Sequence, residues 1–136
     1  MSHQYITLKK VSKEHLDDLN HVNNVQYLLW AQEVAKIHWE KIKGMTSNTN
    51  AVWMVRSHQV NYRLGAFLGD YIRIETYVEE VRGPLSLRVV AFYNDKTDQL
   101  LVRCKTQWCW VELGSRKPLK VTEEIKKLFL NEKTPH

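Results

Sequence analysis

The stretch that decides the fold is residues 17–30, "DDLNHVNNVQYLLW". Two acids, three asparagines and a histidine stand directly before an almost wholly apolar run. Such crowding is typical of the start of a helix, where the first backbone N–H groups lack internal partners and the aligned peptide dipoles create partial positive charge. Asn20 or Asn23 can provide the N-cap, and Asn20 can also adopt a left-handed turn conformation. One cap needs one side chain, so the cluster is larger than capping requires.

The apolar run predicts one long helix over residues 22–42. Val22, Val25 and Leu29 keep the i, i+3, i+4 spacing, and further apolar residues widen that stripe until it nearly surrounds the helix. Lysines near the end complement the helix dipole, and Gly44 is expected to cap it. A helix that is apolar on most faces is expected to be buried.

The rest of the chain changes to the period of strands, punctuated by Gly, Pro, Asn and Asp. Strands are predicted at 4–9, 52–63, 71–81, 85–93 and 100–111, and a short helix at 123–130 with Thr122 as its N-cap. The last four strands, joined by short turns, predict an antiparallel meander whose apolar face the long helix must cover. The expected fold class is α+β, with about five antiparallel strands wrapped around one central helix in a single domain, 1–136.

Composition limits the classes of function. The chain has 136 residues, of which 43% are hydrophobic and 26% charged, as in ordinary soluble domains. No apolar run approaches the ~20 residues of a membrane span, and the N-terminus lacks a signal-peptide pattern, so a cytoplasmic protein without membrane association is expected. Cys104 and Cys109 match neither a disulfide framework nor zinc spacing, and both are expected to be buried.

Two kinds of partner are not predicted. The net charge of +5 is modest, and no dense Lys/Arg block suggests nucleic-acid binding. Six histidines are present, but no H-E-x-x-H motif or close histidine pair indicates a metal hydrolase. The net positive charge does suit a small anionic ligand.

A carboxylate beside a protected helix N-terminus also has a chemical use. Free N–H groups there can hydrogen-bond an acyl oxygen that becomes negative during attack. The carboxylate can act as a general base toward water or as a nucleophile. Asp17 stands a few residues before the predicted helix, in position for either role. The residues alone leave capping and catalysis both open.

Three segments resemble the 4-hydroxybenzoyl-CoA thioesterase-like family of hotdog-fold acyl-CoA thioesterases. The signature D-x-x-G-H-x-N-N-x-x-Y is matched by Asp17, His21, Asn23, Asn24 and Tyr27. "VNYRLGAFLGDYIRIETYVEEV" and "RKPLKVTEEI" resemble two further family segments, and the H-V-N-N motif is similar to that of plant acyl-ACP thioesterases. The resemblance covers nearly the whole chain. Asn20 departs from it, since glycine usually occupies that position.

The resemblance implies a thioester hydrolase that acts on acyl-CoA or acyl-ACP. Asp17 would be the catalytic carboxylate, and the backbone N–H of Asn24 would form the oxyanion hole. Asn20 and His21 would orient water or Asp17, although a structural role for His21 is also open. Tyr27 would line the acyl pocket, with a plain core position as the alternative. No cofactor or metal is expected, since coenzyme A enters only as part of the substrate.

The resemblance also implies a homo-oligomer, a dimer or possibly a tetramer, with sheets paired edge to edge and a shared active site. His58, Asn61 and Arg63, with the neighbouring Gln59, would then reach the neighbour's site. Arg82 and Arg88 are expected to be exposed, either binding the coenzyme A phosphates or remaining solvated strand charges.

Two alternatives keep the same architecture. A hotdog hydratase or dehydratase would protonate carbon instead of cleaving a thioester, although the 17–27 pattern favours hydrolysis. A non-catalytic acyl-CoA-binding module would keep the pocket and the basic rim but would not need Asp17. Acyl length, the thiol carrier and the choice between nucleophile and general base are left open by the sequence.

Overall fold

The computed structural model of the protein describes residues 2–47 and 50–131. Its elements are β1 (Gln4–Lys10), a 3-10 turn η1 (Lys13–His15), α1 (Asn24–Lys43), β2 (Ala51–Tyr62), β3 (Tyr71–Arg82), β4 (Leu85–Asn94), β5 (Leu100–Glu112) and α2 (Glu123–Leu130). Every predicted helix and strand is present, and α2 has the predicted bounds. The ends of the predicted domain, residues 1 and 132–136, lie outside the described residues.

The strands form one five-stranded antiparallel sheet in the order β1-β3-β4-β5-β2. The predicted meander is correct for β3, β4 and β5, but its extension to β2 is wrong because β2 pairs with β5. The reason lies in the segment between β2 and β3, which is held by the helix-start loop instead of forming a tight hairpin. The N–H of Val22 donates to the carbonyl of Ala66 over 2.9 Å, and His21 bridges to Phe67. These contacts hold the end of β2 close to the start of α1.

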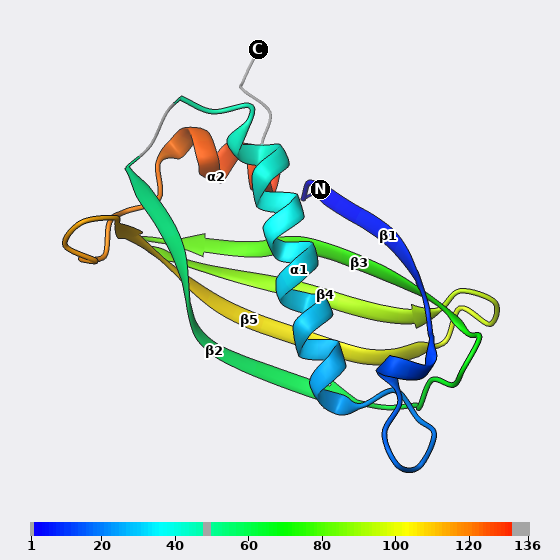
Figure 1. Ribbon diagram of the computed structural model, residues 1–136. Coiled ribbons are helices and arrows are strands. Elements are labelled where there is room, and N and C mark those ends of the chain that lie inside the picture. Colours follow the sequence, from blue (N-terminus) through cyan, green and yellow to red (C-terminus); the bar gives the residue numbers. More distant parts are fainter. Residues whose placement is uncertain (1, 48–49, 132–136) are drawn as a thin grey trace.

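The bounds of α1 follow from its caps. Asn23 is the N-cap, and its side-chain oxygen accepts from the N–H of Val25. The helix therefore begins at Asn24, two residues later than predicted, and ends at Lys43 before its C-cap Gly44. It lies against one face of the sheet, with the edge strands β1 and β2 on either side of it (Figure 1).

Burial of α1 is one-sided. Tyr27, Trp30 and Val34 are buried on the face toward the sheet, whereas Val25 and Leu29 are 59% and 56% exposed. The prediction that apolar contacts would nearly surround the helix is therefore wrong for a single chain. The sheet can cover only one side of a helix, so the outer apolar residues stay at the surface.

The core has two parts, one under each half of α1. Tyr27, Trp30 and Phe92 belong to the part near the helix start, and Ile42 and Phe129 to the part that α2 closes. β3 alternates in burial as its strand period predicts, with Ile72, Ile74, Thr76 and Val78 all buried. Both cysteines are free and buried, as expected. Within the described ranges, no helix combines the length and apolar character needed to cross a membrane.

β2 contains a bulge that changes which residues face the helix. Its register against β5 shifts between Val55 and Ser57, leaving Arg56 as the additional residue. Side chains alternate along a strand, so an extra residue reverses the phase beyond it. Trp53 before the bulge and His58 after it consequently both contact α1.

His38 is a polar residue in the centre of the core, on the buried face of α1. Arg88 donates from Nη1 to His38 Nδ1 over 2.9 Å, so His38 carries its proton on Nε2 and donates to His3 Nδ1 over 2.8 Å. Burial lowers the pKa of His38 to about 3, with the charge of Arg88 as the next cause. His38 is therefore a neutral hydrogen-bonding link.

This pKa predicts an acid-sensitive fold. The folded pKa of about 3 lies below the ordinary 6.5, so between these values the unfolded chain binds the extra proton. The free energy of unfolding should fall as the pH drops from about 6.5 toward 3, by up to about 1.4 kcal/mol per pH unit from this group. Denaturant titrations of the unmodified protein and of His38→Gln test this, with His15→Gln as a matched control. An unchanged slope in His38→Gln would contradict it.

Candidate active site

The loop before α1 holds the carboxylate of Asp17 in one orientation. Asp17 Oδ1 accepts from the N–H of Leu19 over 2.9 Å and from the N–H of His21 over 3.2 Å. The backbone N–H of Asp17 donates to the carbonyl of His21 over 2.8 Å, which closes the loop on itself. In the described part of the chain, Asp17 Oδ2 has no hydrogen-bond partner. One carboxylate oxygen is thus anchored while the other is left available.

Asn20 forms the tip of this loop with φ of +62°, the left-handed conformation predicted for it. Its N–H donates to the carbonyl of Asp17 over 3.0 Å. A left-handed residue strains most side chains but is open to glycine and tolerated by asparagine. Asn20 therefore keeps the turn that glycine makes in the thioesterase family that this sequence resembles.

The first turn of α1 leaves one backbone donor unused. Asn23 caps the N–H of Val25 with its side chain over 3.0 Å, and its carbonyl accepts from Gln26 over 2.9 Å. The N–H of Asn24 has no acceptor among residues 2–47 and 50–131. Such a donor at a helix N-terminus is suited to binding an oxygen that carries negative charge.

Asp17 and Asn24 both line one hollow of about 320 Å³ at the N-terminus of α1. Its lining residues come from the helix-start loop, from α1 and from the end of β2: Asp17, Leu19, His21, Val22, Asn24, Tyr27, Tyr62, Arg63, Leu64 and Gly65. Of the predicted site residues, Asp17, His21, Asn24, Tyr27 and Arg63 are brought together here. Asn20 lies in the same loop but does not line the hollow.

Tyr27 belongs both to the core and to the wall of the hollow. It is 3% exposed, and its ring packs edge-on against Trp30, Tyr62 and Phe92. Its hydroxyl is buried without a hydrogen-bond partner, and burial raises its pKa to about 12. The two positions expected for Tyr27, in a pocket wall and in the core, are therefore compatible. Its hydroxyl is protonated at neutral pH and can donate a hydrogen bond.

His21 is half-buried, and its ring packs edge-on against Phe67 with 4.9 Å between the ring centroids. Its ring nitrogens have no hydrogen-bond partner within the described ranges. Gly65 lies beside this ring, since a Cβ there would meet it at 3.7 Å. The ring therefore has a packing role and also borders the hollow.

Two predicted residues of β2 lie away from the hollow. His58 Nδ1 is 2.8 Å from Thr106 Oγ1, and His58 Nε2 is 3.5 Å from Gln32 Nε2 in the middle of α1. Asn61 is exposed and pairs with Arg103 in the sheet register. The structure does not place either residue beside Asp17 of the same chain.

The two predicted basic residues are separated and differ in environment. Arg82 is exposed and forms an ion pair with Glu80 over 2.6 Å. The expectation that Arg88 is exposed is wrong, because it is 4% exposed and its Nη1 hydrogen-bonds His38 and Thr76. Neutral partners inside the core replace the water that a surface arginine would have.

Tyr62 is a polar lining residue that was not predicted from the sequence. The hydroxyl of Tyr62 donates to the carbonyl of Asn24 over 3.3 Å, which ties the end of β2 to the first turn of α1. The one sequence feature that could have indicated Tyr62 is its place in the second family-like segment, three residues before Gly65, which adjoins His21. In the described part of the chain, no three His, Cys, Asp or Glu side chains are grouped to hold a metal ion.

A five-stranded antiparallel sheet with one long helix packed against it is the arrangement of the hotdog fold. The family model of the Thioesterase-like superfamily matches residues 11–129, and the chain belongs to this superfamily.

Individual relatives agree with this assignment. The long-chain acyl-CoA thioesterase FadM of Escherichia coli is 24% identical over 123 residues, covering 86% of this chain and 90% of FadM. The crystal structure of YbaW, a probable thioesterase from Escherichia coli, is 23% identical and superposes with a TM-score of 0.77, covering 90% of this chain and 94% of YbaW. The 1,4-dihydroxy-2-naphthoyl-CoA thioesterase Slr0204 from Synechocystis is 14% identical with a TM-score of 0.80, covering 93% and 96% of the two chains. These structures share the hotdog fold.

The conformation of Asn20 predicts opposite effects for two small substitutions. Asn20→Ala should lower the free energy of unfolding by about 1 kcal/mol, because alanine is strained at φ of +62°. Asn20→Gly should be nearly neutral, because glycine adopts this conformation freely. Chemical denaturation of both variants makes the comparison. Equal stability of the two would show that the turn imposes no such constraint.

Proposed function

We propose that this protein is an acyl-CoA thioester hydrolase that releases a free carboxylic acid and a thiol. The observation that carries the proposal is that Asp17, whose Oδ2 is available, and Asn24, whose N–H is unpaired, line the same hollow. A nucleophile or base and an oxyanion donor are the two groups that acyl transfer requires. Membership in the Thioesterase-like superfamily gives the reaction class.

In the proposed mechanism, Asp17 acts through its available oxygen, Oδ2. As a general base it removes a proton from water, and the resulting hydroxide attacks the thioester carbonyl. The carbonyl oxygen becomes negative and accepts from the N–H of Asn24. Collapse of the tetrahedral intermediate breaks the carbon–sulfur bond, and the thiolate takes the proton from Asp17. As a nucleophile, Asp17 instead forms a mixed anhydride that water hydrolyses in a second step.

The other lining residues have supporting roles in this proposal. Tyr27 and Tyr62 form an aromatic wall beside the acyl group, and the bond from Tyr62 to the Asn24 carbonyl positions the oxyanion donor. His21 and Asn20 maintain the loop that orients Asp17. Arg63 lines the same hollow and is exposed, so it is placed to meet a phosphate of coenzyme A. Water and a carboxylate suffice for this reaction, so no cofactor or metal is required.

The substrate class is proposed from the relatives' names together with the hollow. FadM is named for long-chain acyl-CoA and Slr0204 for 1,4-dihydroxy-2-naphthoyl-CoA, so coenzyme A thioesters are common to both. A 12:0-ACP thioesterase from Umbellularia californica is also similar, at 14% identity and a TM-score of 0.78, although this chain covers 48% of it. Acyl-CoA is therefore the first substrate to test, with acyl-ACP as the second. A cytoplasmic location, which suits the two free thiols, remains a prediction.

We also propose a homodimer formed through the edge of β2. β2 ends the sheet, so among residues 2–47 and 50–131 no strand pairs with its outer edge. Three apolar residues of this strand are partly exposed: Val52, Met54 and Val55. Exposed apolar side chains on an unpaired edge strand favour association with a second chain. A dimer formed here would place His58, Asn61 and Arg63 near a second helix start, as the sequence predicted.

Sedimentation velocity of the unmodified protein tests this association. A dimer is expected at micromolar concentration, and Met54→Lys should weaken it by placing a charge at the interface. Glu79→Lys, a charge change on β3, serves as the control. A monomer that retains full hydrolytic activity would contradict the proposed dimer but not the proposed reaction.

The catalytic assignment predicts a specific loss in Asp17→Asn. The variant should still fold and bind acyl-CoA, but its release of free thiol should fall by about 10²–10⁴-fold, because asparagine is neither a base nor a nucleophile. A thiol-reactive dye measures release over a panel of acyl-CoA lengths. Asp18→Asn, an exposed neighbour, should keep full activity.

Three results would overturn this assignment. Full activity of Asp17→Asn would remove Asp17 from the chemistry. Tight binding with no thiol release by the unmodified protein, for every acyl-CoA and acyl-ACP tested, would favour a non-catalytic binding module. Water addition to an enoyl-CoA with no hydrolysis would instead favour a hydratase.

A further inference from the structure

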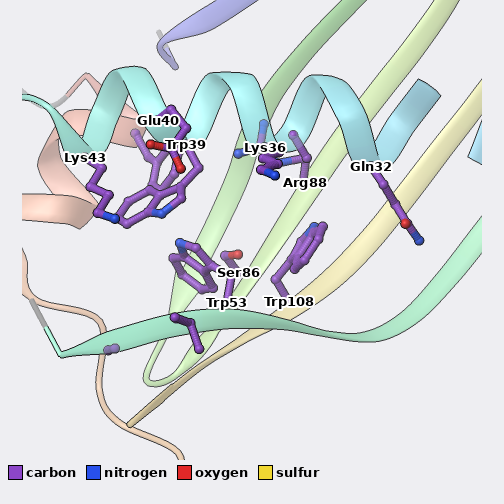
Figure 2. Close-up of a pocket in the computed structure, with 13 residues that line it drawn as sticks. Gln32, Lys36, Trp39, Glu40, Lys43, Trp53, Ser86, Arg88 and Trp108 are labelled. Atoms are coloured by element: carbon purple, nitrogen blue, oxygen red, sulfur yellow. The ribbon is translucent and has the colours of Figure 1, made fainter. Parts of the chain in front are cut away.

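A second hollow of about 390 Å³ lies beside the C-terminal half of α1, between this helix and strands β2, β4 and β5 (Figure 2). Four lining residues are aromatic: Trp39 on the helix, Trp53 and Trp108 on the strands and Phe129 from α2. The helix also contributes polar and charged lining residues: Gln32, Lys36, Glu40 and Lys43. Volumes of this size are typical of sites for small organic ligands. The hollow shares no lining residue with the one at the helix start.

Arg88 supplies a buried cation to this hollow from β4. Its Nη1 donates to His38 Nδ1 over 2.9 Å and to Thr76 Oγ1 over 3.0 Å, and its guanidinium lies over Phe129 at 5.6 Å. In the described part of the chain, no carboxylate forms an ion pair with Arg88, and its Nε and Nη2 have no acceptor. Two of its three nitrogen groups therefore remain available.

An unpaired buried cation is costly to a fold. Burial lowers the pKa of Arg88 to about 9, so the guanidinium still carries its charge at neutral pH. The neutral His38 and Thr76 accept hydrogen bonds but contribute no negative charge. An anion bound at the free side of the guanidinium would offset this cost.

The neighbouring groups are also donors without acceptors. The indole N–H groups of Trp53 and Trp108 are buried and have no hydrogen-bond partner. Ser86, which is 4% exposed, lies between these two rings on the strand side of the hollow (Figure 2). Buried donors are normally paired, so two unpaired indole N–H groups on residues that line this hollow are consistent with a missing acceptor.

We propose that this hollow binds an organic carboxylate, with its apolar body among the tryptophan rings and its carboxylate on Arg88. Arg88 would bind the carboxylate through Nε and Nη2 as a two-pronged pair, and the indole N–H groups and Ser86 would complete its hydrogen bonds. An organic carboxylate fits better than inorganic phosphate, because the four aromatic rings can contact its apolar body while Arg88 binds its charge. Aromatic acids and fatty acids are the members of this class.

This inference goes beyond the proposed hydrolysis and does not require it. Free acids are not hydrolysed, so their binding can be measured whether or not Asp17 is catalytic. Asp17→Asn should therefore leave carboxylate binding at the second hollow unchanged, even where it abolishes turnover.

Quenching of tryptophan fluorescence by 1-naphthoate and by dodecanoate tests the proposal, with 1-naphthalenemethanol, dodecanol and inorganic phosphate as comparisons. The carboxylates should bind at least about tenfold more tightly than the matched alcohols, because a hydrogen-bonded charge pair contributes well over the interaction of a neutral hydroxyl. Inorganic phosphate should not displace them. Arg88→Met should remove this preference for the acid.

Trp108→Phe keeps an aromatic ring but removes one N–H donor, and it should weaken carboxylate binding several-fold while leaving alcohol binding unchanged. This second variant gives the answer if Arg88→Met does not fold. Equal affinity for acid and alcohol in the unmodified protein would overturn the proposal, and so would displacement by phosphate. Carboxylate binding that is unchanged both in Trp108→Phe and in a folded Arg88→Met would also overturn it.

Discussion

The whole arrangement depends on the unpaired N–H groups at the start of α1. A helix must leave its first donors without internal partners, and here one of them belongs to Asn24, a residue that lines a hollow. Asn23 supplies the cap one residue earlier, so the helix is stable while the next donor stays free. The helix dipole then favours negative charge at the same point.

Two segments distant in sequence are needed to surround that donor. The loop before α1 provides Asp17, and the end of β2 provides Tyr62 and is held in place through the following Ala66 and Phe67. Pairing β2 with β5 makes this possible, because it leaves a connection long enough to cross to the helix start. The sheet order is therefore a requirement of the site as well as a feature of the fold.

Periodicity in the sequence was sufficient to predict each helix and strand, because alternation and the 3.6-residue repeat are local properties. The Asp17 loop, the left-handed Asn20 and the Asn23 cap were also predictable, because each depends on neighbours within a few residues. The partner of β2 and the burial of Arg88 were not. Both are set by contacts across the sheet, for which a single sequence gives no direct signal. Periodicity likewise overestimated the burial of α1, since it counts apolar residues without showing what covers them.

The bulge at Arg56 has a consequence for the evolution of this chain. It allows one edge strand to present Trp53 to one hollow and Tyr62 to the other, although their positions differ in parity. Loss of a single codon there would turn one of these rings outward and leave the other in place. Insertions and deletions in β2 should therefore be tolerated far less than substitutions. The residues that line the two hollows should differ between related proteins by substitution only.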